Sequence, residues 1–283
     1  MTELIWLNGK IMPLAQATVS VEDRGFQFAD GVYEVMRVYG GVCFALKQHL
    51  ERLERSAAEL LLKLPLSRPQ LMEQIERLIR QSGLVEGMIY LQLTRGVAPR
   101  NHLFPTCQPT LLFYGRQLPP MADPAQVPGV SLMSVPDFRW QKCWVKSIAL
   151  LPNVLAKNQA LAAGADEAVF VDNHIASECS ASNLMVVRGD KLVTHPAGPR
   201  VLPGITRLLL LELAPQVGLK PEESPITEAE AKAADEVFIT STTREIAWVW
   251  QWDGKAVKPG RCGPATLRLH QALQRHIRQQ TGA

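Results

Sequence analysis

The sequence has little cysteine, and none of it is arranged for metal binding. Its five cysteines are an odd number spread over 283 residues without a CxxC pair: Cys43, Cys107, Cys143, Cys179 and Cys262. Disulfide-rich scaffolds use dense, even sets of cysteines, and zinc ribbons and thioredoxin-like proteins use CxxC pairs. The sequence disfavours all three classes, and its cysteines fit a reducing cytoplasm best.

A charge excess, a long apolar run and a targeting segment are also missing. Lys and Arg number 30 against 27 Asp and Glu, a net charge of +3 that is too small to indicate nucleic acid or a membrane surface. No apolar run approaches the length of a membrane-spanning helix. The start, Met-Thr-Glu-Leu, has neither the basic segment nor the apolar segment of a signal peptide. We expect a cytoplasmic protein that binds neither nucleic acid nor membranes.

The common nucleotide, hydrolase and metal motifs are absent as well. The sequence has no GxGxxG after a strand, no GxxxxGK[ST], no HExxH and no GxSxG. No His cluster has the spacing of metal ligands, so we expect no metal site. Hydrophobic residues make up 47% and charged residues 20% of the chain. This composition is ordinary for soluble globular proteins and excludes a disordered, collagen-like or coiled-coil chain.

A proline-rich stretch, PPMADPAQVP at residues 119–128, divides the chain and has no hydrophobic periodicity. We expect an N-terminal α+β domain over residues 1–118, an inter-domain linker over 119–129 and a C-terminal domain over 130–283. The many hairpins indicate two α+β or α/β domains rather than the regular alternation of a doubly wound sheet.

Periodicity and turn residues predict the secondary structure of both domains. The predicted strands are 4–7, 10–12, 35–39, 42–44, 88–94, 110–114, 130–135, 167–171, 183–187, 191–194, 237–240 and 248–252. The predicted helices are 47–64, 69–81, 153–163, 206–217, 228–234 and 265–279.

Lys146 lies in an unusually apolar run, WQKCWVKSIALL. Burying an ammonium group is costly unless it is paired or its pKa falls, and a lysine of low pKa is a good Schiff-base nucleophile. The more ordinary alternative is a lysine at the end of a strand that reaches solvent. Lys142 shares the expected strand face and is an equal candidate at this stage.

Three further segments carry polar groups that suit anions. Arg95, Arg100 and His102 in TRGVAPRNH suit a carboxylate, although a solvated basic loop is more common. LPGITR (202–207) predicts a helix whose first amide groups bind an anion, or a plain helix start. The turn in FITSTTREI (238–246) offers hydroxyl groups to a phosphate, or closes on its own backbone. A lysine, phosphate-binding turns and a carboxylate-binding loop together suit pyridoxal 5'-phosphate and an amino-acid substrate.

These segments and others resemble one family along nearly the whole chain. The matching blocks are LNGKIMPL, EDRGFQFADGVYEVMRVY, HLERL, TRGVAPRNH, VKSIALLPNVLAK, ECSASN, LPGITR and TSTTREI. The sequence is similar to the class IV aminotransferases of pyridoxal-phosphate fold type IV, and within these to the bacterial D-amino-acid aminotransferases. The resemblance implies the two-domain fold of that class, with residues 130–283 as the cofactor-binding domain.

The resemblance also implies roles for the cofactor-binding residues. Lys146 would bind the cofactor covalently and move the proton at the substrate Cα, and Glu178 would pair with the pyridine nitrogen. Arg52 would bind the phosphate, although on a helical wheel it lies away from the leucine stripe and reads as solvated. The remaining cofactor contacts would come from Leu202 against the ring and from Ile205, Thr206 and Thr242 at the phosphate.

Tyr33, Arg100 and His102 would form a trap for the substrate carboxylate, with the RxH pair supplied by the partner subunit of a homodimer. This pair separates the D-amino-acid enzymes from branched-chain L-aminotransferases and aminodeoxychorismate lyases, which are the alternatives. The implied reaction is a ping-pong transamination between a D-amino acid, by default D-alanine, and 2-oxoglutarate. The sequence departs from the family pattern at Cys179 and Ala181, where Gly and Ser are common.

Overall fold

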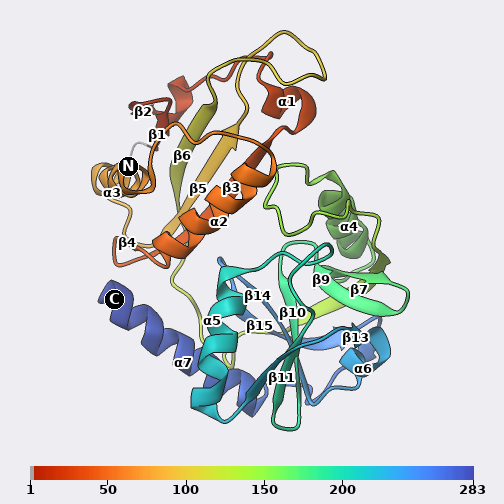
Figure 1. Cartoon of the computed structure of the whole chain (residues 1–283). Coiled ribbons are helices and arrows are strands. Elements are labelled where there is room, and N and C mark those ends of the chain that lie inside the picture. Colours follow the sequence, from red (N-terminus) through yellow and green to blue (C-terminus); the bar gives the residue numbers. More distant parts are fainter. Residues whose placement is uncertain (1–2) are drawn as a thin grey trace. The chain divides into compact units, whose positions relative to one another are not determined.

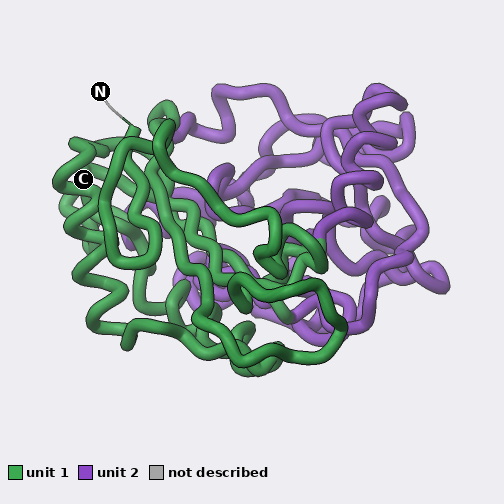
Figure 2. Tube along the Cα trace, turned by 90° about the horizontal axis from the view of Figure 1, so that it is seen from above, with its two compact units in different colours: residues 1–120, 145–149, 277–283 green, residues 121–144, 150–276 purple. Residues whose placement is uncertain are grey.

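The computed structural model describes residues 3–283, and Figure 2 shows its two compact units. Unit 1 consists of the chain up to Pro120 together with Val145–Ala149 and Ile277–Ala283, and unit 2 consists of Met121–Trp144 and Leu150–His276. These limits differ from the expected ones, since residues 119–120 and Ile277–Ala283 also belong to unit 1. Residues 121–129 lie in unit 2 rather than in a separate linker, and 145–149 join unit 1 because Ser147 forms a β-bridge with Val32.

Unit 1 is built on a six-stranded antiparallel sheet (Figure 1). The strand order is β2-β1-β6-β5-β3-β4. The bounds are β1 Leu4–Leu7, β2 Lys10–Pro13, β3 Gly31–Tyr39, β4 Val42–Cys43, β5 Gly87–Thr94 and β6 Thr110–Gln117. The predicted hairpin between β1 and β2 is confirmed, and its turn residues Asn8 and Gly9 both have the positive φ that a type I′ turn requires.

Two helices, α2 (Leu46–Glu59) and α3 (Arg68–Ser82), pack against this sheet, α2 on β3 and α3 on β1 and β6. The side chains of a strand alternate between the two faces of its sheet, and alternate residues of β3 are fully buried. Burial of these residues against the leucine stripes of the helices forms the core of unit 1. Its most buried members are Val32, Met36, Leu50, Leu53, Leu71, Ile75, Leu78, Ile89, Leu91 and Phe113.

Unit 2 contains a ten-stranded mixed sheet with the order β12-β11-β10-β14-β15-β7-β8-β9-β13, to which β16 adds by pairing with β15. The bounds are β7 Val130–Pro136, β8 Glu167–Asp172, β9 Ile175–Cys179, β10 Asn183–Arg188, β11 Lys191–Thr194, β12 Lys220–Glu223, β13 Ile226–Thr227, β14 Glu236–Ser241, β15 Glu245–Trp252 and β16 Lys255–Ala256. The pairs β7–β8, β7–β15 and β11–β12 are parallel and the others are antiparallel.

The helices of unit 2 pack on this sheet, α4 on β7 and β8, α5 on β14, and α6 on β9 and β13. Their bounds are α4 Leu151–Ala162, α5 Ile205–Leu213 and α6 Glu228–Lys232, and a 3-10 turn, Ala214–Val217, extends α5. The last helix, α7 (Pro264–Thr281), has its final residues in unit 1. Across residues 3–283, none of the helices combines the length and hydropathy that crossing a membrane requires.

Two local predictions are wrong. The helix expected over 47–64 ends at Glu59, because Leu61 adopts a left-handed conformation and the Arg95 guanidinium caps the helix by donating to the carbonyls of Leu60 and Leu61. The apolar segment around Lys142 and Lys146 is a loop with turns rather than a strand. Elements without a clear periodic signal were not predicted; they are α1 (Arg24–Phe28), β9, β12, β13 and the short 3-10 helix Leu14–Gln16.

Candidate active site

Lys146 is held against β3 by its own backbone. Its carbonyl accepts a hydrogen bond from the Tyr33 amide at 3.0 Å, and its amide donates to Ser56 Oγ on α2 at 3.1 Å. Its half-buried Nζ lies 4.1 Å from the centroid of the Tyr33 ring. The exposed Lys142 lies instead in unit 2, where its Nζ is 5.8 Å from a Trp144 ring centroid. Burial and fixed backbone geometry therefore favour Lys146 over Lys142 as the reactive lysine.

A fully buried carboxylate, Glu34, lies next to Tyr33 on the opposite face of β3. Arg52 Nε and Nη2 donate to its two oxygens at 2.7 and 2.8 Å, and His49 Nδ1 lies 2.8 Å from Oε2. Burial alone would raise the pKa of Glu34, but the charges and hydrogen bonds of Arg52 and His49 lower it to about 2. Burial lowers the pKa of His49 despite its acidic neighbour. Glu34 is therefore an ionised partner that fixes the Arg52 guanidinium.

The helical-wheel indication that Arg52 is solvated, which the family resemblance opposes, is wrong, because the residue is only 3% exposed. Helix α2 buries a polar stripe, His49, Arg52 and Ser56, beside its leucine stripe. A helical wheel reveals only the apolar stripe. The missing signal was Glu34, which shares the buried face of β3 with Val32 and Met36 and needs a cationic partner there.

Arg100 and His102 are exposed and surround one ring, that of Phe28 at the end of α1. The Arg100 guanidinium lies 4.7 Å and the His102 ring 5.5 Å from its centroid. In the described part of the chain, no hydrogen bond, ion pair or ring contact joins either residue to Tyr33. The predicted carboxylate trap is therefore not assembled by these contacts within one chain.

The third basic residue of this loop, Arg95, has a structural role. It is buried and pairs with Asp30 through two hydrogen bonds of 2.8 and 3.0 Å. Asp30 also binds Arg24, which donates to the carbonyl of Asn101 between Arg100 and His102. The expectation that Arg95 converges with the other two on a ligand is wrong. It supports the loop that carries them.

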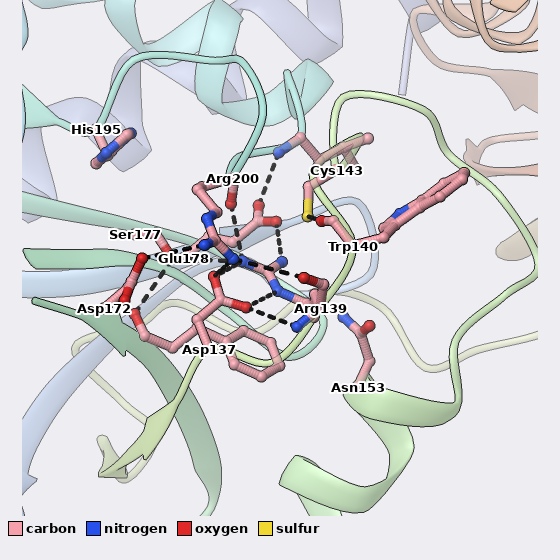
Figure 3. A network of polar contacts seen from close by, with 12 residues as sticks. Asp137, Arg139, Trp140, Cys143, Asn153, Asp172, Ser177, Glu178, His195 and Arg200 are labelled. Atoms are coloured by element: carbon pink, nitrogen blue, oxygen red, sulfur yellow. Dashed lines mark hydrogen bonds and ion pairs between the residues drawn. The ribbon is translucent and has the colours of Figure 1, made fainter.

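In unit 2, Glu178 at the end of β9 is buried among hydrogen-bond donors (Figure 3). Its Oε1 accepts from Arg139 Nη1 at 2.5 Å, and its Oε2 accepts from Asn183 Nδ2 at 2.9 Å and from the Leu202 amide at 3.0 Å. Burial raises the pKa of Glu178 to about 7 against the opposing effect of Arg139. A carboxylate has about four lone-pair positions, so three donors leave room for one more.

Asn183 links Glu178 to Leu202 and to β14. Its Nδ2 donates to both Glu178 and the carbonyl of Leu202, and in the sheet it is paired with Thr240 of β14. A Cβ on Gly204, the N-cap of α5, would lie 2.0 Å from Asn183 Oδ1, so only glycine permits this approach. The start of α5 thereby lies beside the Asn183 side chain, and the end of β14 pairs with the Asn183 backbone.

The predicted phosphate-binding residues lie at the start of α5 and just after β14. Ile205 and Thr206 are the first residues of α5, where backbone amides have no partner within the helix. Thr242 follows β14, and the buried Thr240 Oγ1 has no hydrogen-bond partner among the described residues. The arrangement offers several donors to an anion. Across residues 3–283, no three His, Cys, Asp or Glu side chains are grouped as metal ligands, and the five cysteines are unpaired.

The sequence matches the family described as amino-transferase class IV over residues 31–252. The chain belongs to the class IV aminotransferases. It is 40% identical to a D-alanine aminotransferase of Bacillus licheniformis, over 98% of each chain. The branched-chain amino acid aminotransferase of Escherichia coli is 27% identical with a TM-score of 0.89, over 98% of this chain and 95% of that one. A branched-chain amino acid aminotransferase of T.th., solved with pyridoxamine 5'-phosphate, is 26% identical with a TM-score of 0.90, over 98% and 94%.

The family and the fold predicted from the eight sequence blocks are thus confirmed for this class IV aminotransferase. Sequence reasoning missed Arg139, Glu34 and Asn183, which hold Glu178 and Arg52 in place. Glu34 and Asn183 lie inside matched blocks, but Arg139 lies in a loop without any motif. Cys179, a departure from the family pattern, is buried in the core of unit 2, whereas Ala181 is exposed.

Glu34→Gln should destabilise the protein by about 3–5 kcal/mol at pH 7, because two buried basic side chains lose their ionised partner. Since the pKa of Glu34 falls from an ordinary 4.5 to about 2 in the folded chain, this advantage is complete above about pH 4.5 and disappears as the pH falls through 2. Urea unfolding at pH 7, 4 and 3 measures the difference. Glu51→Gln, which breaks a partly exposed pair between α2 and Arg68 of α3, should cost less than about 1 kcal/mol. A Glu34→Gln deficit that is the same at pH 7 and pH 3 would contradict the ionised state.

Proposed function

We propose that this chain is a pyridoxal-phosphate-dependent aminotransferase that transfers the amino group of a D-amino acid, D-alanine by default, to 2-oxoglutarate. The single observation that carries the chemistry is Lys146, half-buried with Nζ over Tyr33 and its peptide fixed to β3. The preference for D-amino acids rests on the relative that is 40% identical over nearly the whole chain, which is named a D-alanine aminotransferase. The branched-chain enzymes are more distant in sequence.

The residues present fit the cofactor. The remaining lone pair of Glu178 suits a protonated ring nitrogen, which also stabilises the ionised carboxylate. The free amides at the start of α5 and the unpartnered Thr240 hydroxyl suit a phosphate. In this proposal, the cofactor is bound by Lys146, Arg52, Glu178, Leu202, Ile205, Thr206 and Thr242.

Bound pyridoxal phosphate supplies an aldehyde that takes up an amino group and a ring that draws electrons from the substrate Cα. Lys146 Nζ would take the proton from the substrate Cα and later give it back, so one side chain would serve as both base and acid. Glu178 keeps the ring nitrogen protonated, and Arg52, fixed by Glu34, neutralises phosphate charge. Transfer in the reverse sense to 2-oxoglutarate gives D-glutamate and restores the starting enzyme.

Tyr33, Arg100 and His102 bind the substrate carboxylate in this proposal, with Arg100 and His102 supplied by a second copy of the chain. Helix α4 supports a homodimer, because it packs its small residues, Ala156 and Ala160, inward and exposes large aliphatic side chains. Those exposed side chains are Leu151, Val154, Leu155 and Leu161. An apolar face of this kind normally lies in an interface. The unpaired cysteines agree with a cytoplasmic location.

The direct test is the visible absorbance of the purified protein with pyridoxal phosphate. D-alanine should remove the long-wavelength band and 2-oxoglutarate should restore it. A response to L-leucine alone would place the chain with the branched-chain enzymes and remove Arg100 and His102 from the proposal. The absence of any band after cofactor addition would contradict the whole proposal.

Lys146→Ala should lower turnover by about 10⁴-fold or more, because one group acts as covalent anchor, base and acid. Steady-state transamination of D-alanine measures the loss. Lys142→Ala, in the same loop but exposed, is the matched control and should keep wild-type turnover. A Lys146→Ala variant with near wild-type activity would refute the assignment.

Arg100→Ala should raise KM for D-alanine about 10- to 100-fold and leave the cofactor bound, because it removes one charge-assisted carboxylate contact. Arg80→Ala, which changes an exposed arginine of α3, should leave KM unchanged. Loss of cofactor from Arg100→Ala instead would show that Arg100 has a different role.

Leu155→Glu should convert the dimer to a monomer of 31.4 kDa, because it places a charge in the exposed apolar face of α4. Sedimentation velocity at micromolar concentration measures the mass. Gln126→Glu adds the same charge at an exposed site outside this face and should leave the mass unchanged. A dimeric Leu155→Glu protein that sediments like the wild type would remove α4 from the interface.

A further inference from the structure

A line of side chains with alternating charge leads from Glu178 to Asp172 in unit 2 (Figure 3). Arg139 contacts Glu178 at 2.5 Å and Asp137 at 2.9 and 3.0 Å. Arg200 Nη1 lies 3.7 Å from Asp137 Oδ2, and Arg200 Nη2 lies 3.1 Å from Asp172 Oδ2. The Asp137 side chain is completely buried, whereas that of Asp172 is 46% exposed. Buried charges in such a line are stable only when each has its partner.

Arg139 is fixed on every side. Nε and Nη2 bind the two oxygens of Asp137, and Nη2 also donates to the carbonyl of Arg200 at 2.8 Å. Its guanidinium lies 4.0 Å from the centroid of the Phe170 ring. These contacts leave Nη1 directed at Glu178 Oε1. A bidentate carboxylate pair fixes both the plane and the direction of a guanidinium, which a single contact does not.

We propose that Asp137, supported by Arg200, is a positioning residue that fixes Arg139 against Glu178, and so favours the ionised form of the Glu178 carboxylate and orients it for its ligand. Only the identity of that ligand, the cofactor ring nitrogen, rests on the proposed function. The ionisation of Glu178 is a property of the chain itself.

The direction in which the pKa of Glu178 changes when Asp137 is replaced distinguishes positioning of Arg139 from a direct effect of the Asp137 charge. Through space, the negative charge of Asp137 disfavours a second carboxylate, so its removal alone would make Glu178 easier to ionise. If Asp137 acts by orienting Arg139, its removal has the opposite effect. The neighbouring thiols of Cys143 and Cys179 add no charge near Glu178 at pH 7, because burial raises the pKa of both and keeps them neutral.

The ionisation of Glu178 can be followed in the full-length protein, with and without pyridoxal phosphate, by ¹³C NMR of glutamate labelled at Cδ. The Glu178 signal is the one that Glu178→Gln lacks. Its midpoint in the wild type is expected near pH 7 without cofactor, as burial raises the pKa to about 7. Arg139→Met should raise the midpoint by about 1–3 pH units, and Asp137→Asn should raise it by less. A lower or unchanged midpoint in Asp137→Asn would overturn the proposal.

A double variant tests the route of the effect. In an Arg139→Met background, Asp137→Asn should no longer raise the midpoint, because the residue it positions is gone. A further rise there would contradict the positioning role. Arg188→Met, which changes an exposed arginine of β10 paired with Glu230, should leave the midpoint unchanged.

If Asp137→Asn does not fold, Arg200→Gln, at a side chain that is one quarter exposed, is compared in the wild-type and Arg139→Met backgrounds. The loss of its positive charge alone raises the midpoint in both backgrounds, so a positioning role requires a larger rise in the wild-type background. Arg200→Gln keeps the backbone carbonyl that binds Arg139, and an equal rise in both backgrounds would overturn the proposal. With cofactor bound, the pH dependence of its absorbance should shift in Asp137→Asn and remain unchanged in Arg188→Met. Failure of the proposed function would appear differently, as a wild-type protein that does not respond to D-alanine.

Discussion

Burial of carboxylates is the constraint on which both units depend. A buried ionised carboxylate costs several kcal/mol unless cations and hydrogen bonds replace its water. Glu34 is satisfied by Arg52 and His49, and Glu178 by Arg139, Asn183 and the Leu202 amide. Each carboxylate therefore fixes the residues around it, among them Arg52 of unit 1 and the Leu202 peptide of unit 2.

The two carboxylates have opposite environments and therefore different ionisation. Glu34 has two basic neighbours, and its pKa falls to about 2, whereas burial dominates at Glu178 and raises its pKa to about 7. Glu34 is thus a permanent anion suited to fixing an arginine. Glu178 is balanced between its two states, so that a cationic group placed beside it would favour the ionised state. A single sequence of ordinary composition produces both results through the choice of neighbours.

Much of this organisation could be predicted from the sequence. The hairpin at Asn8-Gly9, the helix after Pro203-Gly204 and the turn after β14 follow from local rules, and the structure confirms them. Local rules failed where tertiary contacts decide. Leu61 ends α2 because Arg95, 34 residues later, binds the last carbonyls, and Arg52 is buried because Glu34, 18 residues earlier, requires it. Arg139 could not be predicted, since its partners come from three separate segments.

The assignment of Val145–Ala149 to unit 1 has a consequence for how this chain can be divided. The chain crosses from unit 1 to unit 2 near Pro120, returns for five residues that include Lys146, and leaves again. A fragment cut after Pro120 would lack the segment bridged to β3, and the remaining fragment would carry that segment without its partner strand. Neither unit can therefore be exchanged with that of a relative as one continuous piece, and the two halves of such an enzyme must change together in evolution and in engineering.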